Sequence, residues 1–167
     1  MFTKFKNKGF TLVELIVVIA IIGLMATATL AVLNPFSQFQ KSTDARVKSD
    51  LSQIQKALET YYEDHNGYPA NDINYQIVGS GGVSIVWGSN WSSYMNVVPK
   101  DPTAGHKYIY YSPNRQTYYL YANLLRGSVD SQSCSGGSIC TNVPAGVNCG
   151  SASVVCNFGV SSPNTKP

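Results

Sequence analysis

Four cysteines have the most distinctive chemistry in this chain, and all lie in its last third: Cys134, Cys140, Cys149 and Cys156. A structural zinc site would need closely spaced cysteine pairs or accompanying histidines. Here successive cysteines are six, nine and seven residues apart, and neither histidine lies nearby. An even number of cysteines in an exported chain instead predicts two disulfides. Three pairings are open, and we favour the sequential one because it closes short loops.

The other reactive side chains do not form a recognisable catalytic arrangement. The sequence contains no G-x-S-x-G, H-E-x-x-H or G-x-x-x-x-G-K motif. His106 stands alone before a predicted strand, Asp101 fits an ordinary turn, and His65 closes an apolar helical stripe. We therefore expect no catalytic residue, no bound metal and no cofactor.

The N-terminal segment combines a basic start with a long apolar run. Residues 1–9 contain three lysines, and from residue 10 to residue 33 the one charged side chain is Glu14. About 20 apolar residues are enough to cross a bilayer as a helix. Flanking positive charge marks the cytoplasmic end of such a helix. The sequence thus predicts a single membrane span with a cytoplasmic N-terminus.

The net charge of the chain comes from that basic start. Of twelve Lys and Arg residues, three lie in residues 1–9, which contain no acid, so nine basic and nine acidic residues remain elsewhere. A nucleic-acid-binding surface should show clustered excess basic charge. We therefore do not expect nucleic acid as a partner.

A small-x-small sequence at Ala26-Thr27-Ala28 offers one interpretation of the apolar run, an ordinary signal peptide. Cleavage after Ala28 would release a secreted soluble binding domain. However, the apolar residues continue to Leu33, and Glu14 interrupts their beginning. A carboxylate inside a membrane helix costs a few kcal/mol and usually has a function.

The residues Lys8-Gly9-Phe10-Thr11-Leu12-Val13-Glu14-Leu15 resemble the class III signal of type IV pilins and type II secretion pseudopilins. In that family a prepilin peptidase cuts after the glycine, and the new N-terminal amine is methylated. The resemblance implies cleavage between Gly9 and Phe10 and N-methylation of Phe10. Because this cut precedes the apolar run, the hydrophobic helix stays in the mature protein.

The same resemblance assigns Glu14 and Phe10 to assembly. The family glutamate pairs with the N-terminal amine of a neighbouring subunit, and a carboxylate buried in a filament core needs such a cationic partner. For a membrane monomer, a carboxylate resting among lipid headgroups is the simpler interpretation. The implied partners are copies of this chain in a helical filament, prepilin peptidase, an inner-membrane assembly platform and minor pilins.

The family further implies a location and a metal site. The chain would wait in the cytoplasmic membrane and then enter a periplasmic or extracellular filament. Surface pilus, secretion pseudopilus and DNA-uptake filament all stay open. Major pseudopilins bind calcium through acids near the C-terminus, but beyond Asp101 this chain has only Asp130. We therefore expect that calcium site to be missing.

After the apolar run, Asn34-Pro35 predicts a kink or short break, because proline disfavours helical geometry at the preceding residue. Apolar residues then recur every three or four positions, which predicts an amphipathic helix. Its buried stripe would contain Val47, Leu51, Ile54, Leu58, Tyr61 or Tyr62, and His65, with Asp44, Arg46, Lys48, Asp50, Lys56, Glu59 and Glu63 between them. Asn66-Gly67-Tyr68-Pro69 ends it, with glycine suited to the left-handed cap.

The remainder reads as strands and turns. Residues 75–78 and 83–87 predict short strands, and residues 107–111 and 117–122 predict an antiparallel hairpin. Alternation along that hairpin should place half of its tyrosines on the helix and half outward. The segment from Gly127 onwards is rich in Ser and Gly and has too few apolar residues to hold itself together without cross-links.

The sequence therefore predicts an α+β protein of the pilin fold. A long N-terminal helix would pack through its amphipathic half on a small antiparallel sheet, with a disulfide-linked C-terminal loop region. The expected divisions are a leader (1–9), a hydrophobic helix (10–33), an amphipathic helix (34–66), a sheet (67–126) and a variable tail (127–167).

Overall fold

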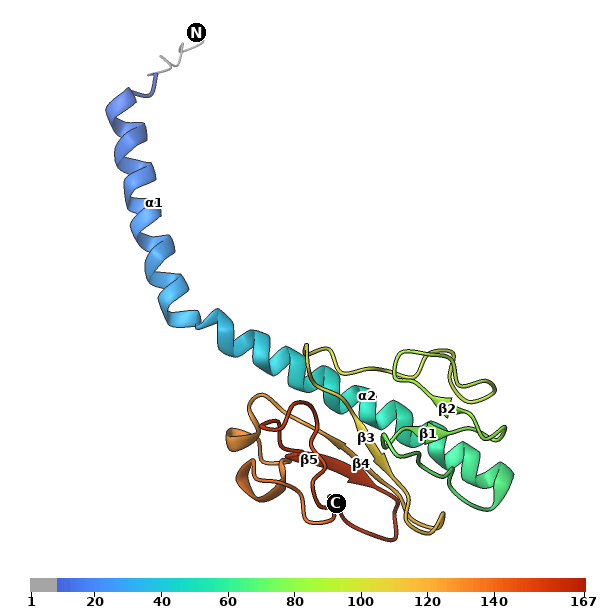
Figure 1. Cartoon of the computed structure of the whole chain (residues 1–167). Helices are drawn as coiled ribbons and strands as arrows, with labels where there is room; N and C mark the ends of the chain where they lie inside the picture. Colours follow the sequence, from blue (N-terminus) through green and yellow to red (C-terminus); the bar gives the residue numbers. More distant parts are fainter. Residues whose placement is uncertain (1–8) are drawn as a thin grey trace. The chain divides into compact units, whose positions relative to one another are not determined.

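The computed structural model describes residues 9–167, and the chain divides into two compact units, one ending at Phe39 and the other beginning at Gln40 (Figure 1). The expectations that concern the three N-terminal lysines lie outside the described residues. Each unit is built around one helix of the predicted pair, and the α+β architecture expected from the sequence is confirmed.

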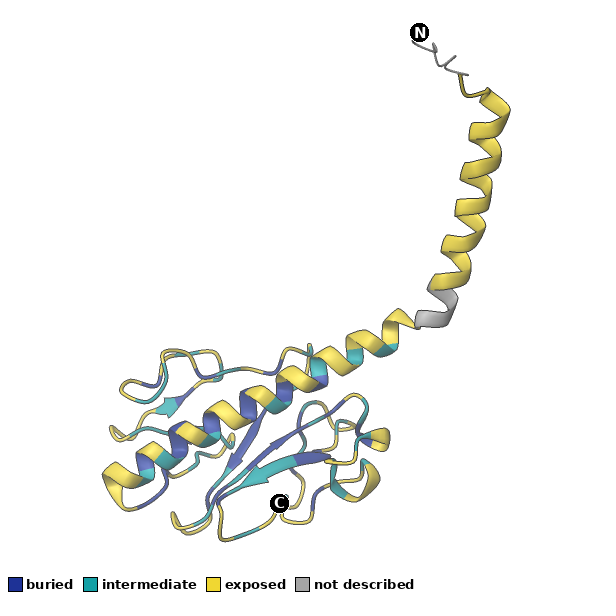
Figure 2. Cartoon of the chain, turned by 180° about the vertical axis from the view of Figure 1, so that it is seen from behind, coloured by how far each residue is buried: buried dark blue, intermediate teal, exposed yellow. Residues whose placement is uncertain are grey.

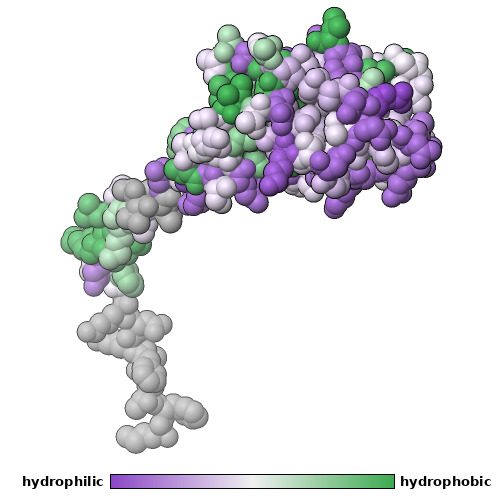
Figure 3. Space-filling view, turned by 90° about the horizontal axis from the view of Figure 1, so that it is seen from below, coloured by the Kyte–Doolittle hydropathy of each residue, from purple (hydrophilic) through white to green (hydrophobic). Residues whose placement is uncertain are grey.

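The first helix, α1 (Leu12–Leu33), is apolar on all sides, and its described surface is largely hydrophobic (Figure 3). Its described side chains, through Thr29, are all exposed (Figure 2). Within the described residues it is the one helix long and apolar enough to cross a membrane, over Leu12–Thr29. A helix without a polar face requires an apolar environment on every side.

The predicted break falls at Asn34. This residue has the left-handed conformation (φ 38°, ψ 72°) and caps α1, and Pro35 opens the second helix, α2 (Pro35–His65). Asparagine tolerates the left-handed conformation. Proline is suited to the first position of a helix, because the backbone N–H that it lacks would have no partner within the helix there. Local sequence alone therefore accounts for two helices rather than one.

Beyond its first turns, α2 buries one face: Asp44, Val47, Asp50, Leu51, Ile54, Ala57, Leu58 and Tyr61. Two predictions at its C-terminal end were wrong. His65 is exposed, and its ring stacks on Tyr61 with 4.0 Å between ring centroids. Asn66, not Gly67, takes the left-handed position after the helix, with φ 52°.

The main sheet has three antiparallel strands in the order β3 (Ile109–Tyr111), β4 (Tyr119–Ala122) and β5 (Phe158–Ser161). β3 and β4 form the predicted hairpin, with Tyr110 opposite Leu120. β5 was not predicted. It pairs with the free edge of β4, so the central strand of the sheet has a partner on each side.

A second, two-stranded sheet joins β1 (Ile77–Val78) and β2 (Ser84–Ile85). Both strands lie within the segments predicted to be extended. Ile77 and Ile85 face each other across this pair, and both belong to the main core.

Apolar residues pack on both faces of the main sheet. One face of the sheet packs against the buried side of α2. The buried residues on this face, in or next to the strands, are Tyr108, Tyr110, Tyr118, Leu120 and Ala122. The other face brings Ile109 and Tyr121 together with Cys140, Val147, Cys149 and Cys156. The predicted alternation is therefore correct. The expected outward exposure is wrong for Tyr121, which is fully buried because the C-terminal segment covers it.

That segment forms a layer held by two disulfides, Cys134–Cys140 and Cys149–Cys156. Its regular structure is limited to β5 and two short 3₁₀ turns, η1 (Gly127–Val129) and η2 (Cys134–Gly136). Asn157 fastens the layer to the segment after β4, because its side-chain amide accepts from the N–H of Leu124 and donates to the C=O of Leu124. The tail is thus part of the folded core.

Replacing Cys149 and Cys156 together by alanine should lower the free energy of unfolding by about 2–4 kcal/mol. Both cysteines are fully buried against the sheet, so the change loses packing as well as the cross-link. Urea unfolding of the detergent-solubilised chain measures the loss. The paired Cys134→Ala and Cys140→Ala variant is the comparison and should lose less, because Cys134 is only half-buried. Equal stability of the Cys149/Cys156 variant and the parent chain would contradict a structural role for this layer.

Candidate functional site

The residues predicted for cleavage and modification lie just before α1. Gly9 and Phe10 have no regular structure and are exposed, Phe10 by 83%. A peptide bond in an exposed, non-helical stretch can enter the active site of a peptidase. The structure thus places the Gly9–Phe10 bond where an enzyme could reach it.

Glu14 lies in the first turn of α1, where it forms a capping box with Thr11. Its Oε2 atom accepts from the backbone N–H of Thr11 at 2.9 Å and from the Thr11 hydroxyl at 2.8 Å. In return, the Glu14 N–H donates to the Thr11 hydroxyl oxygen at 3.2 Å. The carboxylate is therefore held at the N-terminal end of the apolar helix, where negative charge is favourable. The sequence did not lead us to this role of Thr11.

Two acidic residues that we expected on the solvent side of α2 are buried instead. Asp44 accepts from the backbone N–H groups of Leu125 and Arg126, at 2.8 and 3.0 Å, through its two oxygens. Asp50 accepts from the hydroxyl of Tyr108 at 2.9 Å. Both carboxylates fasten α2 to the segments it covers, and burial without such partners would be costly.

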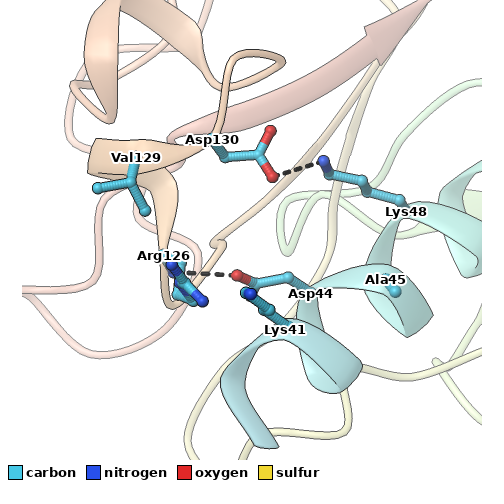
Figure 4. Close-up of a pocket in the computed structure, with 7 residues that line it drawn as sticks. All are labelled: Lys41, Asp44, Ala45, Lys48, Arg126, Val129 and Asp130. Carbon is cyan, nitrogen blue, oxygen red and sulfur yellow. Dashed lines mark hydrogen bonds and ion pairs between the residues drawn. The ribbon is translucent and has the colours of Figure 1, made fainter. Parts of the chain in front are cut away.

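Beside Asp44 lies a cavity of about 240 Å³ between α2 and the segment after β4 (Figure 4). Lys48 bridges its rim, with its Nζ 2.6 Å from Asp130 Oδ2 and 2.8 Å from Gln132 Oε1. The hydrogen bond from Lys48 lowers the pKa of Asp130 below its ordinary value. Both carboxylates of this cavity are engaged within the chain, so the cluster is structural.

The proline-flanked Asp101 is also buried, with 8% of its surface exposed. Its Oδ1 accepts from the N–H of Thr103 at 2.8 Å, as in an ordinary turn, but its Oδ2 is buried without a hydrogen-bond partner among residues 9–167. Burial raises the pKa of Asp101 above its ordinary value, although the Thr103 N–H and the nearby His106 oppose this change. The expected turn residue is thus a carboxylate whose charged form is destabilised by the fold.

Among residues 9–167 there is no group of three or more His, Cys, Asp or Glu side chains placed to hold a metal ion. All four cysteines are oxidised in disulfides. The expectation that the calcium site is missing stays a prediction.

The structure has the features of a pilin-like protein. An exposed apolar helix carries a glutamate in its first turn, and it is followed by an amphipathic helix that packs on a small sheet. Residues 4–30 match the prokaryotic N-terminal methylation motif, and residues 34–135 match the family of type II secretion system protein G. The second match covers more than half of the chain, which therefore belongs to that family. The family consists of structural pseudopilins, not enzymes.

Individual relatives agree with this membership. The type II secretion system core protein G of Klebsiella pneumoniae is 32% identical over 66% of this chain and 78% of its own length. The core protein G of Escherichia coli K12 is 29% identical over 68% of this chain and 78% of its own length. A type IV major pilin, PilA of Myxococcus xanthus, is 36% identical over 42% of this chain and 32% of its own length. No solved structure matches significantly.

Asp101→Asn should raise stability at neutral pH relative to the parent chain. Because the folded pKa of Asp101 is raised, the parent loses stability as the pH rises above the ordinary value of 3.8 towards the folded pKa. The asparagine can still accept from Thr103 but carries no charge. Urea unfolding at several pH values should therefore show an advantage of the variant that is smallest below pH 3.8 and grows with pH.

The control for this test is Asp72→Asn. Asp72 also accepts from backbone N–H groups, those of Asn74 and Gln76, but it is less buried than Asp101. If the two variants show the same dependence on pH, burial is not the cause of the effect at Asp101.

Proposed function

We propose that this chain is a structural subunit of a pseudopilus of a type II secretion system, cut between Gly9 and Phe10 and polymerised through α1. The observation that carries the proposal is an apolar helix with every described side chain exposed and a single acid, Glu14, in its first turn. Such a surface needs lipid before assembly and other helices afterwards. Membership in the protein G family favours the secretion pseudopilus.

Glu14 would set the register between neighbouring subunits. In the single chain its Oε2 accepts from both the N–H and the hydroxyl of Thr11. In a filament core, surrounded by apolar helices, its charge would need a cation. The N-methylated amine of Phe10 on the next subunit has the right charge, and a single charge pair in an apolar bundle would fix the axial offset between the subunits.

The partners follow from the same assignment. Copies of this chain would form the filament, and minor pilins and an inner-membrane platform would start and drive its growth. Prepilin peptidase would act on the exposed stretch before Thr11. The chain would then move from the cytoplasmic membrane to a filament in the periplasm or outside the cell.

The competing proposal, release of a soluble domain after Ala28, is less well supported. Ala28 lies inside α1, with no break near it, and the hydroxyls of Thr27 and Thr29 donate to carbonyl oxygens of the preceding turn. Peptidases bind extended chains, so this bond would have to leave the helix before it could be cut.

Mass spectrometry of the mature protein should find a methylated Phe10 as its first residue. Gly9→Leu should block this cut, because a side chain would replace the hydrogen of the glycine, and should leave the full-length precursor in the membrane. A mature N-terminus at Thr29 would instead support the soluble-domain alternative.

Glu14→Ala should leave membrane insertion and cleavage intact but reduce filament yield. A charge-assisted hydrogen bond contributes about 1.5–3 kcal/mol, so each subunit contact should weaken roughly 10- to 100-fold. Shearing of filaments from cells, followed by immunoblotting, measures the yield. Glu63→Ala, which removes an exposed acid near the end of α2, is the matched control and should assemble normally.

Filaments formed by Glu14→Ala in normal amounts would contradict its role in register. Deletion of the chain also separates the possible roles. Loss of protein secretion supports a secretion pseudopilus, whereas loss of surface filaments with intact secretion supports a type IV pilus.

A further inference from the structure

Two phenylalanines at the start of α2 are not covered by any of the residues that the structure describes. Phe36 and Phe39 are exposed by 71% and 76%. They are three residues apart and therefore lie on the same side of the helix. Neither belongs to the core that buries the later part of α2. Two large aromatic rings that stay in water together are unfavourable, so an apolar partner from outside the chain is expected.

The position of these rings in the sequence identifies the partner. The helix α1 has 22 residues and is roughly 33 Å long, which matches a hydrocarbon core of about 30 Å. When α1 spans the membrane, the residues just beyond Leu33 must lie at the level of the lipid headgroups. Phe36 and Phe39 follow within six residues, and they belong to the same compact unit as the span.

The local structure gives this segment an apolar and a polar side. The break at Asn34 ends one helix and lets Pro35 start another, so the first turn of α2 need not continue the path of α1. On the helical wheel, Lys41 lies nearly opposite the two phenylalanines, and Gln38 lies about 100° from Phe39. A short segment with an apolar and a polar side is suited to a membrane interface.

We propose that the first five residues of α2 dock on the outer surface of the bilayer through Phe36 and Phe39 while the chain is a membrane monomer. The occupant of this face is lipid, at the boundary between headgroups and acyl chains. The contact continues the membrane contact of α1. It needs the chain to be anchored but does not need it to polymerise. Assembly must then remove lipid from these two rings as well as from α1.

The test uses the full-length chain in phosphatidylcholine vesicles, with Phe36→Trp and Phe39→Trp made separately. Each variant keeps a large apolar ring, and the parent chain supplies the background emission of Trp87 and Trp91. The added emission should shift to shorter wavelength and be quenched by lipids brominated near the headgroup, and less by lipids brominated near the bilayer centre. Gln38→Trp, on another side of the same turn, should be quenched much less.

Three results would overturn the proposal. They are a lack of quenching in both phenylalanine variants, equal quenching in Gln38→Trp, and a blue-shifted emission that brominated lipid does not quench. The last result would mean that a second copy of the chain covers the rings.

Adding Glu14→Ala to Phe39→Trp separates this proposal from the assembly proposal. Quenching should persist in that double variant, which is impaired in polymerisation if the assembly proposal holds. If quenching persists and filaments still form, the assembly role of Glu14 fails and the membrane contact stands. If quenching is lost from Phe39→Trp alone, the membrane contact fails whatever the filaments do.

Discussion

A helix that its own chain leaves uncovered is the constraint on which the rest of this structure depends. The described side chains of α1 are exposed along the whole stretch that could cross a membrane. At about 25 cal/mol per Å² of apolar surface, such a helix is strongly unfavourable in water. It must always be covered from outside, first by lipid and, in the proposed filament, by other copies. The second helix, α2, differs, because beyond its first turns its apolar face is covered by the chain itself. We call the covering part, from Gly67 to the last residue, the head.

The head has little regular structure with which to cover α2 and its own sheet. A three-stranded sheet with one face open would leave Ile109 and Tyr121 in water, and small sheets need cover to be stable. The C-terminal layer supplies this cover although it has little regular structure of its own. Its order depends on two disulfides, on the pairing of β5 with β4 and on the two hydrogen bonds between Asn157 and Leu124. Short covalent loops thus take the place of a second helix on this side of the sheet.

The sequence predicted features that depend on neighbouring residues. The break at Asn34-Pro35, the buried stripe of α2 and the hairpin of β3 and β4 all follow from local geometry or periodicity. Several features that depend on distant partners were not predicted. Phe158 to Ser161 pairs with a strand more than thirty residues earlier, and its composition did not distinguish it from the loops around it. Asp44 and Asp50 were placed in solvent by their charge, because only the folded chain shows the N–H groups and the hydroxyl that they accept from.

The sequence allowed more specific predictions for the candidate site than for the head, because the pattern of the site is contained in a few adjacent residues. Gly9, Phe10 and Glu14 were all named from their spacing and from the resemblance, and their roles stay predictions. The contribution of Thr11 was missed, although Thr11 and Glu14 are spaced as in a capping box and stand before an apolar run, a pattern that the sequence alone displays. Conversely, the chemistry of Asp101 depends on burial by segments far away in sequence, and its place in the sequence suggested only a turn.

The bonding of Glu14 explains why processing and assembly would be linked in the proposed filament. Before cleavage the nitrogen of Phe10 is part of a peptide bond and carries no charge, and Glu14 is satisfied within its own chain by Thr11. Cleavage turns that nitrogen into an amine, which stays cationic when it is methylated. In the proposed pathway, the same cut would thus create a charge of the sign that Glu14 lacks, and it would remove the three N-terminal lysines. An uncut chain could pack its helix against others, but it would bring an unpaired carboxylate into an apolar core, which costs several kcal/mol per charge. In the proposed filament, electrostatics would therefore oppose the polymerisation of uncut chains.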